Sequence, residues 1–318
     1  MQIRFVLTLL AVVTATLAQN PQAKRPKILG VAHMALYVSD LDKARAFYKD
    51  FLGYEEPFKL QRKDGSGDRI AFIKVNEDQY IELFAEPPKK DGQLNHIAFY
   101  TDDARGMRDY LASVGVKVPD SVGKGQVGNS NFNIIDPDGY TVEIVQYEPD
   151  GWMRREKGKF LPATRISDRI GHIGVLVGDL SASQRFYGGI LGFHETWRGG
   201  GSPRQLSWVN MQVPNGEDYL EMMLYSRYPE SDQVGVKNHV CLVTPDIERA
   251  VKILEARPAR QQYKHQIEIK TGVNRRRQAN LFDPDGTRIE LMEPGTVDGK
   301  PVPPSTAPPP VPQRRATN

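Results

Sequence analysis

The chain has 318 residues, with 42 Lys and Arg against 39 Asp and Glu, which gives a formal net charge of +3. This mild charge does not support nucleic-acid binding, and the length suggests about two domains. Cys241 is the single cysteine, so the sequence excludes an internal disulfide.

Residues 1–18 have the form of a secretory signal peptide. Arg4 gives a positive start, Phe5–Val13 is apolar, and Thr16 and Ala18 place small residues before the predicted cleavage point. The apolar stretch is too short for a membrane-spanning helix. We therefore expect an exported protein, periplasmic or secreted, with no stable membrane anchor after cleavage. The alternative is an uncleaved N-terminal anchor.

The first predicted domain spans residues 28–148 and begins with an apolar strand, Val31–Val38, which carries His33. Apolar residues at helical spacing predict a helix over residues 41–52. Strands are then predicted at Ile70–Val75 and at Tyr80–Ala85, and Glu82 lies on the second of these. The unit is thus a strand, a helix and two or three further strands.

The same unit then begins again within the first domain. The strand Asn95–Thr101 carries His96, and Asp102 or Asp103 is placed to cap a following helix. A turn at residues 136–139 precedes the closing strand, which carries Glu143. The first domain therefore contains two similar units.

The second predicted domain, residues 170–294, repeats this plan. His172 follows His33 by 139 residues, and Glu221 follows Glu82 by the same interval. A repeat that keeps its register over this length indicates a duplicated domain. Residues 149–169 lack periodicity and are predicted to be a linker, although Trp152 suggests that part of it packs on a domain. The proline-rich residues 295–318 are predicted to be a disordered tail.

Each of the four units has one histidine on its first strand and one glutamate on its last. A buried carboxylate needs a partner or a metal ion. Two imidazoles with two carboxylates suit a divalent ion of zinc, nickel, iron, cobalt or manganese. The alternative is that these polar groups pair only with one another. The eight candidate ligands are His33, Glu82, His96, Glu143, His172, Glu221, His239 and Glu290.

The sequence resembles the vicinal oxygen chelate superfamily, which includes glyoxalase I, methylmalonyl-CoA epimerase, extradiol dioxygenases, and fosfomycin and bleomycin resistance proteins. The resemblance implies an α+β fold of paired βαβββ modules with cupped mixed sheets, and it implies the eight residues above as metal ligands. It is carried by DLDKARAFYKDFLGY and DLSASQRFYGGILGF, by NHIAFYT and NHVCLVT, and by DPDGYTVEIV and DPDGTRIELM.

A complete His/Glu/His/Glu set is similar to that of bacterial glyoxalase I. The resemblance implies a small substrate that chelates the metal through adjacent oxygens, with a ligand glutamate moving the proton. By position, Glu143 and Glu290 would be the catalytic bases. However, the usual thiol cofactor of glyoxalase I is cytosolic, which conflicts with the expected export.

Two other readings stay open. Extradiol dioxygenases usually place a tyrosine where this chain has Asn133 and Asn280, and a histidine upstream that is missing here, so ring cleavage by that mechanism is disfavoured. A non-catalytic binding or resistance protein would use the cup to hold a small molecule. Four aromatic residues would line the cup or form plain core, namely Tyr37, Phe84, Phe99 and Tyr219.

The grouping of the ligands is also open at this point. His33 and Glu82 would share a metal either with His96 and Glu143 or with the second pair of the other domain. The sequence is also compatible with a homodimer.

Overall fold

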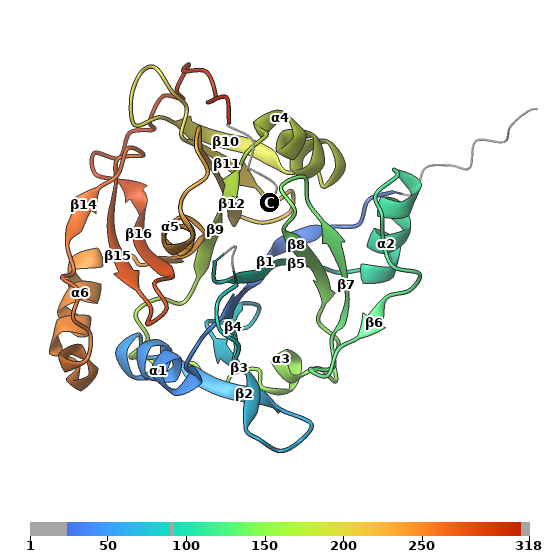
Figure 1. Ribbon diagram of the computed structural model, residues 1–318, viewed down its shortest axis with the longest axis vertical. Coiled ribbons are helices and arrows are strands. Elements are labelled where there is room, and N and C mark those ends of the chain that lie inside the picture. The colour runs from blue at the N-terminus through green and yellow to red at the C-terminus, as the bar shows by residue number, and fades with distance from the viewer. Residues whose placement is uncertain (1–23, 90–91, 313–318) are drawn as a thin grey trace, which may run out of the picture.

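The computed structural model describes residues 24–89 and 92–312, and the expected signal peptide lies outside these residues. The described chain forms two eight-stranded mixed sheets, one in each half (Figure 1). This confirms the expected fold of two tandem domains with cupped sheets. Among the described helices, none combines the length and the apolar character needed to cross a membrane.

The first sheet has the strand order β2-β3-β4-β1-β5-β8-β7-β6. β1 pairs in parallel with β4 and antiparallel with β5, so the first strands of the two units lie side by side at its centre. Its strands are β1 (Ile28–Tyr37), β2 (Glu55–Gln61), β3 (Asp68–Lys74), β4 (Tyr80–Phe84), β5 (Leu94–Thr101), β6 (Gly123–Lys124), β7 (Ser130–Ile135) and β8 (Thr141–Gln146).

The second sheet repeats this topology, in the order β10-β11-β12-β9-β13-β16-β15-β14. Its strands are β9 (Ile170–Val177), β10 (His194–Gly199), β11 (Trp208–Gln212), β12 (Tyr219–Leu224), β13 (His239–Val243), β14 (Ile269–Thr271), β15 (Arg276–Phe282) and β16 (Arg288–Thr296).

The helices differ in detail from the predicted ones. The Asp40 carboxylate accepts the backbone N–H groups of Asp42 and Lys43, so the predicted helix begins there, but its second half is a π-helix in both domains. Short helices without a full period of apolar residues escaped sequence analysis. The helices are α1 (Leu41–Arg45), η1 (Ala46–Phe51), α2 (Ala104–Ser113), α3 (Trp152–Arg155), α4 (Leu180–Ser183), η2 (Gln184–Ile190), α5 (Ser231–Lys237), α6 (Ile247–Ala256) and η3 (Pro258–Gln261).

The two-residue period of β1 gives its two faces different roles. Met34 and Leu36 belong to a large apolar core that runs through both domains, whereas His33 and Tyr37 lie on the opposite face, inside the cup. Phe99, one of the aromatic residues considered for the cup, is on the core side. Its ring packs edge-on against Phe193 of the second domain at 5.0 Å, so Phe99 does not line the cup.

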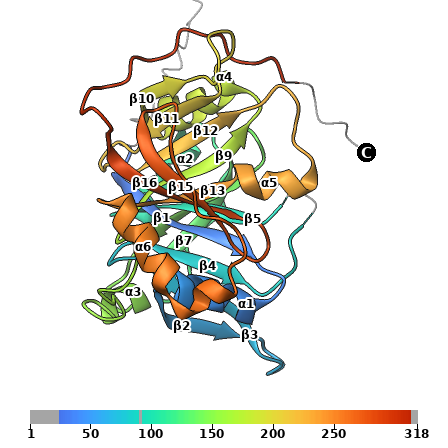
Figure 2. The ribbon, with the colours of Figure 1, turned by 90° about the vertical axis from the view of Figure 1, so that its left-hand side faces the viewer.

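The domains bury their helices against each other in a reciprocal way. The Tyr48 hydroxyl in η1 donates to Asp283 of the second domain at 3.1 Å, and the Tyr187 hydroxyl in η2 donates to Asp136 of the first at 2.8 Å. Phe51 also stacks on Tyr263 at 4.6 Å. Two views show α1 lying beside α6 of the second domain (Figures 1 and 2). Each half therefore supplies part of the other's core.

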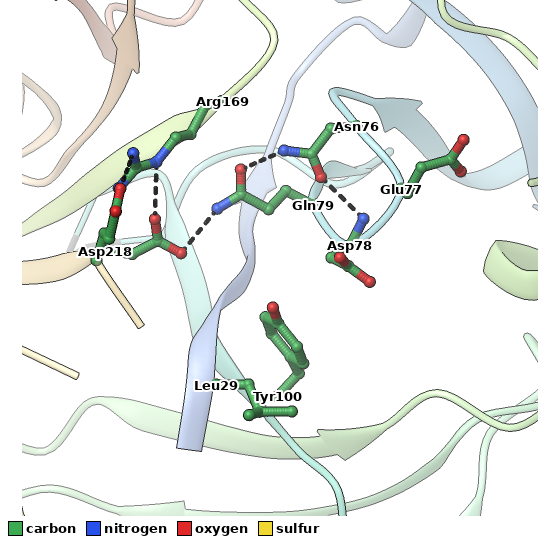
Figure 3. Close-up of a pocket in the computed structure, with 9 residues that line it drawn as sticks. Leu29, Asn76, Glu77, Asp78, Gln79, Tyr100, Arg169 and Asp218 are labelled. Carbon is green, nitrogen blue, oxygen red and sulfur yellow. Dashed lines mark hydrogen bonds and ion pairs between the residues drawn. The ribbon is translucent and has the colours of Figure 1, made fainter. Parts of the chain in front are cut away.

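A polar junction joins the first strands of the two domains (Figure 3). The Gln79 side chain donates to Asp218 at 3.1 Å and accepts the backbone N–H of Ile170 at 2.8 Å. Asp218 accepts the backbone N–H of Val31 and the Nε–H of Arg169. A pocket of about 440 Å³ lies at this junction. None of the eight candidate ligands lines it, so the junction serves the packing of the domains.

The linker and the tail are more ordered than their sequences suggest. Trp152 of the linker is fully buried in the first cup, where its ring packs against Tyr80 at 5.3 Å. β16 continues to Thr296. The tail was expected to be disordered, but up to residue 312 it follows the second domain. The backbone N–H of Leu206 donates to Pro308 O at 2.9 Å, and Ala307 is buried.

Candidate metal centres

The first centre joins four strands of one domain. The Nε2 atoms of His33 and His96 are 2.8 Å apart. The nearer Glu143 oxygen is 3.1 Å from His96 Nε2 and 3.8 Å from His33 Nε2. Glu82 oxygens lie 3.8 Å from His33 Nε2 and 3.7 Å from His96 Nε2. All four candidate residues from this domain therefore converge on one point in the cup.

The second centre has the same construction. The Nε2 atoms of His172 and His239 are 3.1 Å apart. A Glu290 oxygen lies 3.2 and 3.4 Å from these two nitrogens, and a Glu221 oxygen lies 3.9 and 3.5 Å from them. The structure thus answers the question of grouping, because each centre forms within one domain and not across the two.

The sheet registers explain this convergence. In the first domain His33 lies opposite Tyr80 and Ala35 opposite Glu82, because β1 and β4 run in parallel. Side chains two residues apart share a face, which places His33 and Glu82 together inside the cup. The second domain repeats the register between β9 and β12. All eight candidate ligands are at most 8% exposed.

The donor atoms fit a divalent metal ion. Metal–ligand distances of about 2.1 Å place neighbouring donor atoms roughly 3.0–3.5 Å apart, close to most of the separations seen here. His239 Nδ1 donates to the Lys237 carbonyl at 2.7 Å, which leaves its Nε2 lone pair directed at the centre. His96 Nδ1 lies 2.8 Å from Asn95 Oδ1, an equivalent acceptor. Two neutral imidazoles and two carboxylates would match the charge of the ion.

The protonation of the first centre is uneven. Burial lowers the pKa of His33 to about 3, which keeps it neutral and able to act as a ligand. Burial and the neighbouring charge of Glu143 outweigh the attraction of His96 and raise the pKa of Glu82 to about 8. Burial acts in the same direction on Glu143, but hydrogen bonds from His96 and Asn131 and electrostatic attraction by the histidines lower its pKa to about 2.

Arg288 distinguishes the second centre, and sequence analysis missed it. Its Nη2 lies 2.7 Å from Nδ1 and 3.0 Å from Nε2 of His239. Burial, followed by the charge of Arg288, lowers the pKa of His239 to about 3. Arg288 precedes Glu290 by two residues, where the first domain has Thr141 before Glu143. The only sequence signal was this difference between otherwise matching closing strands.

A glycine makes room for the second arrangement. A Cβ atom at Gly174 would lie 1.9 Å from Cε1 of His239. The matching residue of β1 is Ala35, which faces His96 across the β1–β5 pair. The His239 ring therefore occupies space that a side chain takes in the first domain, and Arg288 packs against it.

The four aromatic residues that sequence analysis left between the cup and the core have mixed positions. Tyr219 stacks on His172 at 4.6 Å, as Tyr80 stacks on His33 at 4.4 Å. Phe84 meets His96 edge-on at 6.1 Å, and Tyr37 meets Phe84 at 6.2 Å. These contacts place Tyr37, Phe84 and Tyr219 on the cup side of the sheets, unlike Phe99.

The two asparagines that disfavoured ring cleavage lie next to the closing glutamates. Asn133 lies opposite Glu143 in the β7–β8 pair, and Asn280 lies opposite Glu290 in the β15–β16 pair. Both positions therefore look into the cups. Asn131, on the same face as Asn133, donates to the far oxygen of Glu143 at 2.9 Å and fixes its orientation.

Two tandem curled sheets, each with a group of residues that could hold a metal ion, define a class of protein, and comparison of the sequence identifies it. The model of the Glyoxalase/Bleomycin resistance protein/Dioxygenase superfamily matches residues 30–144 and 169–291. The chain belongs to this superfamily, as its sequence resemblance implied.

Individual relatives represent more than one reaction. Glyoxalase I of Saccharomyces cerevisiae is 24% identical over 248 residues, which cover 70% of each chain. The Mn(II)-bound glyoxalase of Novosphingobium aromaticivorans shares the fold with a TM-score of 0.63 at 17% identity, over 87% of this chain and 84% of that one. A homoprotocatechuate 2,3-dioxygenase variant from B. fuscum has a TM-score of 0.63 at 20% identity, over 86% of this chain and 73% of that one. One of these relatives thus binds Mn(II), and this chain has two groups that could hold a metal ion.

Proposed function

We propose that this protein is a metal-dependent enzyme that catalyses proton transfer, in the manner of a glyoxalase or epimerase. Its substrate is a small molecule that chelates the metal through adjacent oxygens. The observation that carries the proposal is the convergence of a complete His/Glu/His/Glu set in each cup. The similarity to glyoxalase I supports the same reading.

The bound metal would polarise the substrate oxygens and so acidify the neighbouring carbon–hydrogen bond. His33, Glu82, His96 and Glu143 would hold the ion in the first cup, and the corresponding four residues would hold it in the second. Glu143 and Glu290 are the proposed bases. Asn131 holds one oxygen of Glu143, which orients the carboxylate toward the centre. Trp152 and Tyr80 exclude water from one side of the first cup.

We also propose that the protein works outside the cytoplasm, as a periplasmic or secreted protein. The support is the signal-peptide form of residues 1–18. N-terminal sequencing of the protein from its own cell would test this, and a mature chain that still starts at Met1 would contradict cleavage.

A dioxygenase that uses non-haem iron is the second candidate. The tightest part of each centre is a group of two histidines and one glutamate, namely His33, His96 and Glu143 in the first cup. Two histidines and one carboxylate form the facial triad of many iron oxygenases. Asn133 and Asn280 disfavour ring cleavage by the usual extradiol mechanism. A non-catalytic binding protein is the third candidate.

Elemental analysis of protein purified without chelators would be the first test. Nickel, zinc, cobalt or manganese supports the main proposal, and iron favours the oxygenase. A chain that holds no metal and takes none up contradicts both enzymes and leaves the binding protein.

Deuterium uptake from D2O into the α-carbon of 2-hydroxycarbonyl compounds would then test proton transfer directly. Glu143→Gln should reduce this exchange in the metal-loaded chain. Arg105→Gln, an exposed change on α2, is the control and should leave the exchange rate unaltered.

A further inference from the structure

Three cationic side chains of the second cup form no direct ion pair with an acidic side chain among the described residues. Arg288 lies on β16 inside the cup, while Arg227 and Lys237 are exposed at its rim. Within residues 24–89 and 92–312, none of the three forms an ion pair with Asp or Glu, in contrast to Arg277, which pairs with Glu248 and Glu293. The charge of Arg288 acts on Glu221 and Glu290 without a direct contact, so its N–H groups remain available to a ligand.

Arg288 is positioned deepest of the three. Its Nη2 contacts the His239 ring and lies 3.7 Å from the Met223 sulfur. Its Nε is buried and has no hydrogen-bond partner among the described residues. A guanidinium group carries five N–H donors, and burying them without acceptors is unfavourable. An anionic ligand with two oxygens would supply the missing acceptors.

A cavity lies at the rim of this cup, and its wall includes Met223, the residue whose sulfur Arg288 contacts. It measures about 300 Å³ and is lined in part by Leu176, Trp208, Met223, Tyr225, Arg227 and Lys237, with no Asp or Glu in its wall. Trp208 pairs with Met223 across β11 and β12, two residues before the pair formed by Asn210 and Glu221. The cavity and the second centre therefore share one face of the sheet.

We propose that this cavity binds a small organic carboxylate with an oxygen on the neighbouring carbon, a 2-hydroxy or 2-oxo carboxylate with an apolar body. Arg288 binds the carboxylate, and Trp208 and Met223 contact the apolar body. The choice of a neighbouring oxygen rests on the proposed function, since that oxygen and a carboxylate oxygen form the adjacent pair that a metal would chelate. The first cup has Thr141 in place of Arg288, so the arginine-dependent carboxylate site is confined to the second cup.

Calorimetric titration of the full mature chain with mandelate, a 2-hydroxy carboxylate with an aromatic body, tests the inference. Its neutral analogue, mandelamide, is titrated in parallel. The variants are Arg288→Gln, Arg288→Lys and the charge-removal control Arg105→Gln. Metal-free and metal-loaded samples are both used, and metal uptake is measured separately on the same preparations.

We expect one mandelate per metal-free chain, with an affinity for mandelamide at least tenfold lower. Arg288→Gln should lower the affinity for mandelate at least tenfold, and Arg288→Lys should lower it less. Arg105→Gln should leave this affinity unchanged. Equal binding of mandelate and mandelamide by the unaltered chain overturns the inference, even if Arg288→Gln fails to fold. Binding of mandelate that survives Arg288→Gln in a folded chain also overturns it. A chain that takes up no metal but binds mandelate through Arg288 contradicts the proposed function and not the carboxylate site.

Discussion

The two centres have the same set of donor residues and different surroundings. In the first cup, His96 faces Ala35, no cation of the described residues packs against its ring, and the linker tryptophan Trp152 fills the side behind Tyr80. In the second, His239 occupies the space above Gly174, and Arg288 packs against it. Duplication has therefore preserved the donor geometry while the local charge has changed. Residues that contact a candidate metal ligand can therefore give two sites with the same donor residues different electrostatic surroundings.

The largest effect on stability is expected at the aromatic filling of the first cup. Trp152→Ala should lower the free energy of unfolding by about 3–5 kcal/mol, because it leaves a cavity among Tyr80, Phe72 and Phe58. Denaturant titration measures this loss. Trp152→Phe, which keeps part of the ring volume, should cost clearly less. A cost below about 1 kcal/mol for the alanine variant would show that the linker does not support the first cup.

The pH dependence of stability should be alike in the two domains. Burial raises the pKa of Asp136 and of Asp283 to about 6, from an ordinary value of 3.8. A carboxyl group with a raised pKa holds its proton longer in the folded chain than in the unfolded one. The free energy of unfolding therefore falls as the pH rises through about 4 to 6.

Asparagine variants isolate this contribution of the two aspartates. Between pH 4 and pH 7, the free energy of unfolding of the unaltered chain should fall by up to about 3 kcal/mol more than that of Asp283→Asn. Asp136→Asn should behave in the same way. Urea unfolding at a series of pH values measures the difference. A constant difference across that range for both variants would contradict the raised pKa values.

Loss of a ligand should separate the two centres in metal binding. Glu143→Gln should weaken the metal affinity of the first centre at least about 100-fold, since even partners of ligands contribute 10–100-fold. Competition with a chelating dye measures this affinity. Glu290→Gln gives a chain in which only the first centre is intact, and Glu143→Gln gives a chain in which only the second centre is intact. Equal affinities in the two single-centre chains would show that Arg288 does not matter to the metal.

Exchanging Thr141 and Arg288 between the two centres tests the effect of the arginine on metal affinity more finely. Thr141→Arg should weaken metal binding at the first centre about tenfold, because a fixed cation near the site repels the ion, and Arg288→Thr should strengthen binding at the second by a similar factor. Each change is made in the matching single-centre chain and measured with the same dye. Arg105→Gln again serves as the control. Unchanged affinities after both exchanges would attribute any inequality of the centres to another cause.

The donor residues could be predicted from the sequence because their pattern is local and repeated. His33 and Glu82 each lie on an apolar strand, and their counterparts recur at a fixed interval. Arg288 and Gly174 carry no such signal, since their effect depends on a ring that reaches them from another strand. Trp152 was placed in a linker without periodicity, and only tertiary packing shows what it covers. Phe99 was left between the cup and the core, because the strand period gives two faces without saying which one is the cup.

The reciprocal burial of Tyr48 and Tyr187 has an evolutionary consequence. Each half of the duplication completes the hydrophobic core of the other, so neither copy can be lost or become independent without exposing apolar surface. The centres, in contrast, are each complete within one half. Selection for folding therefore holds the copies together, while selection for chemistry is free to change one centre and leave the other intact.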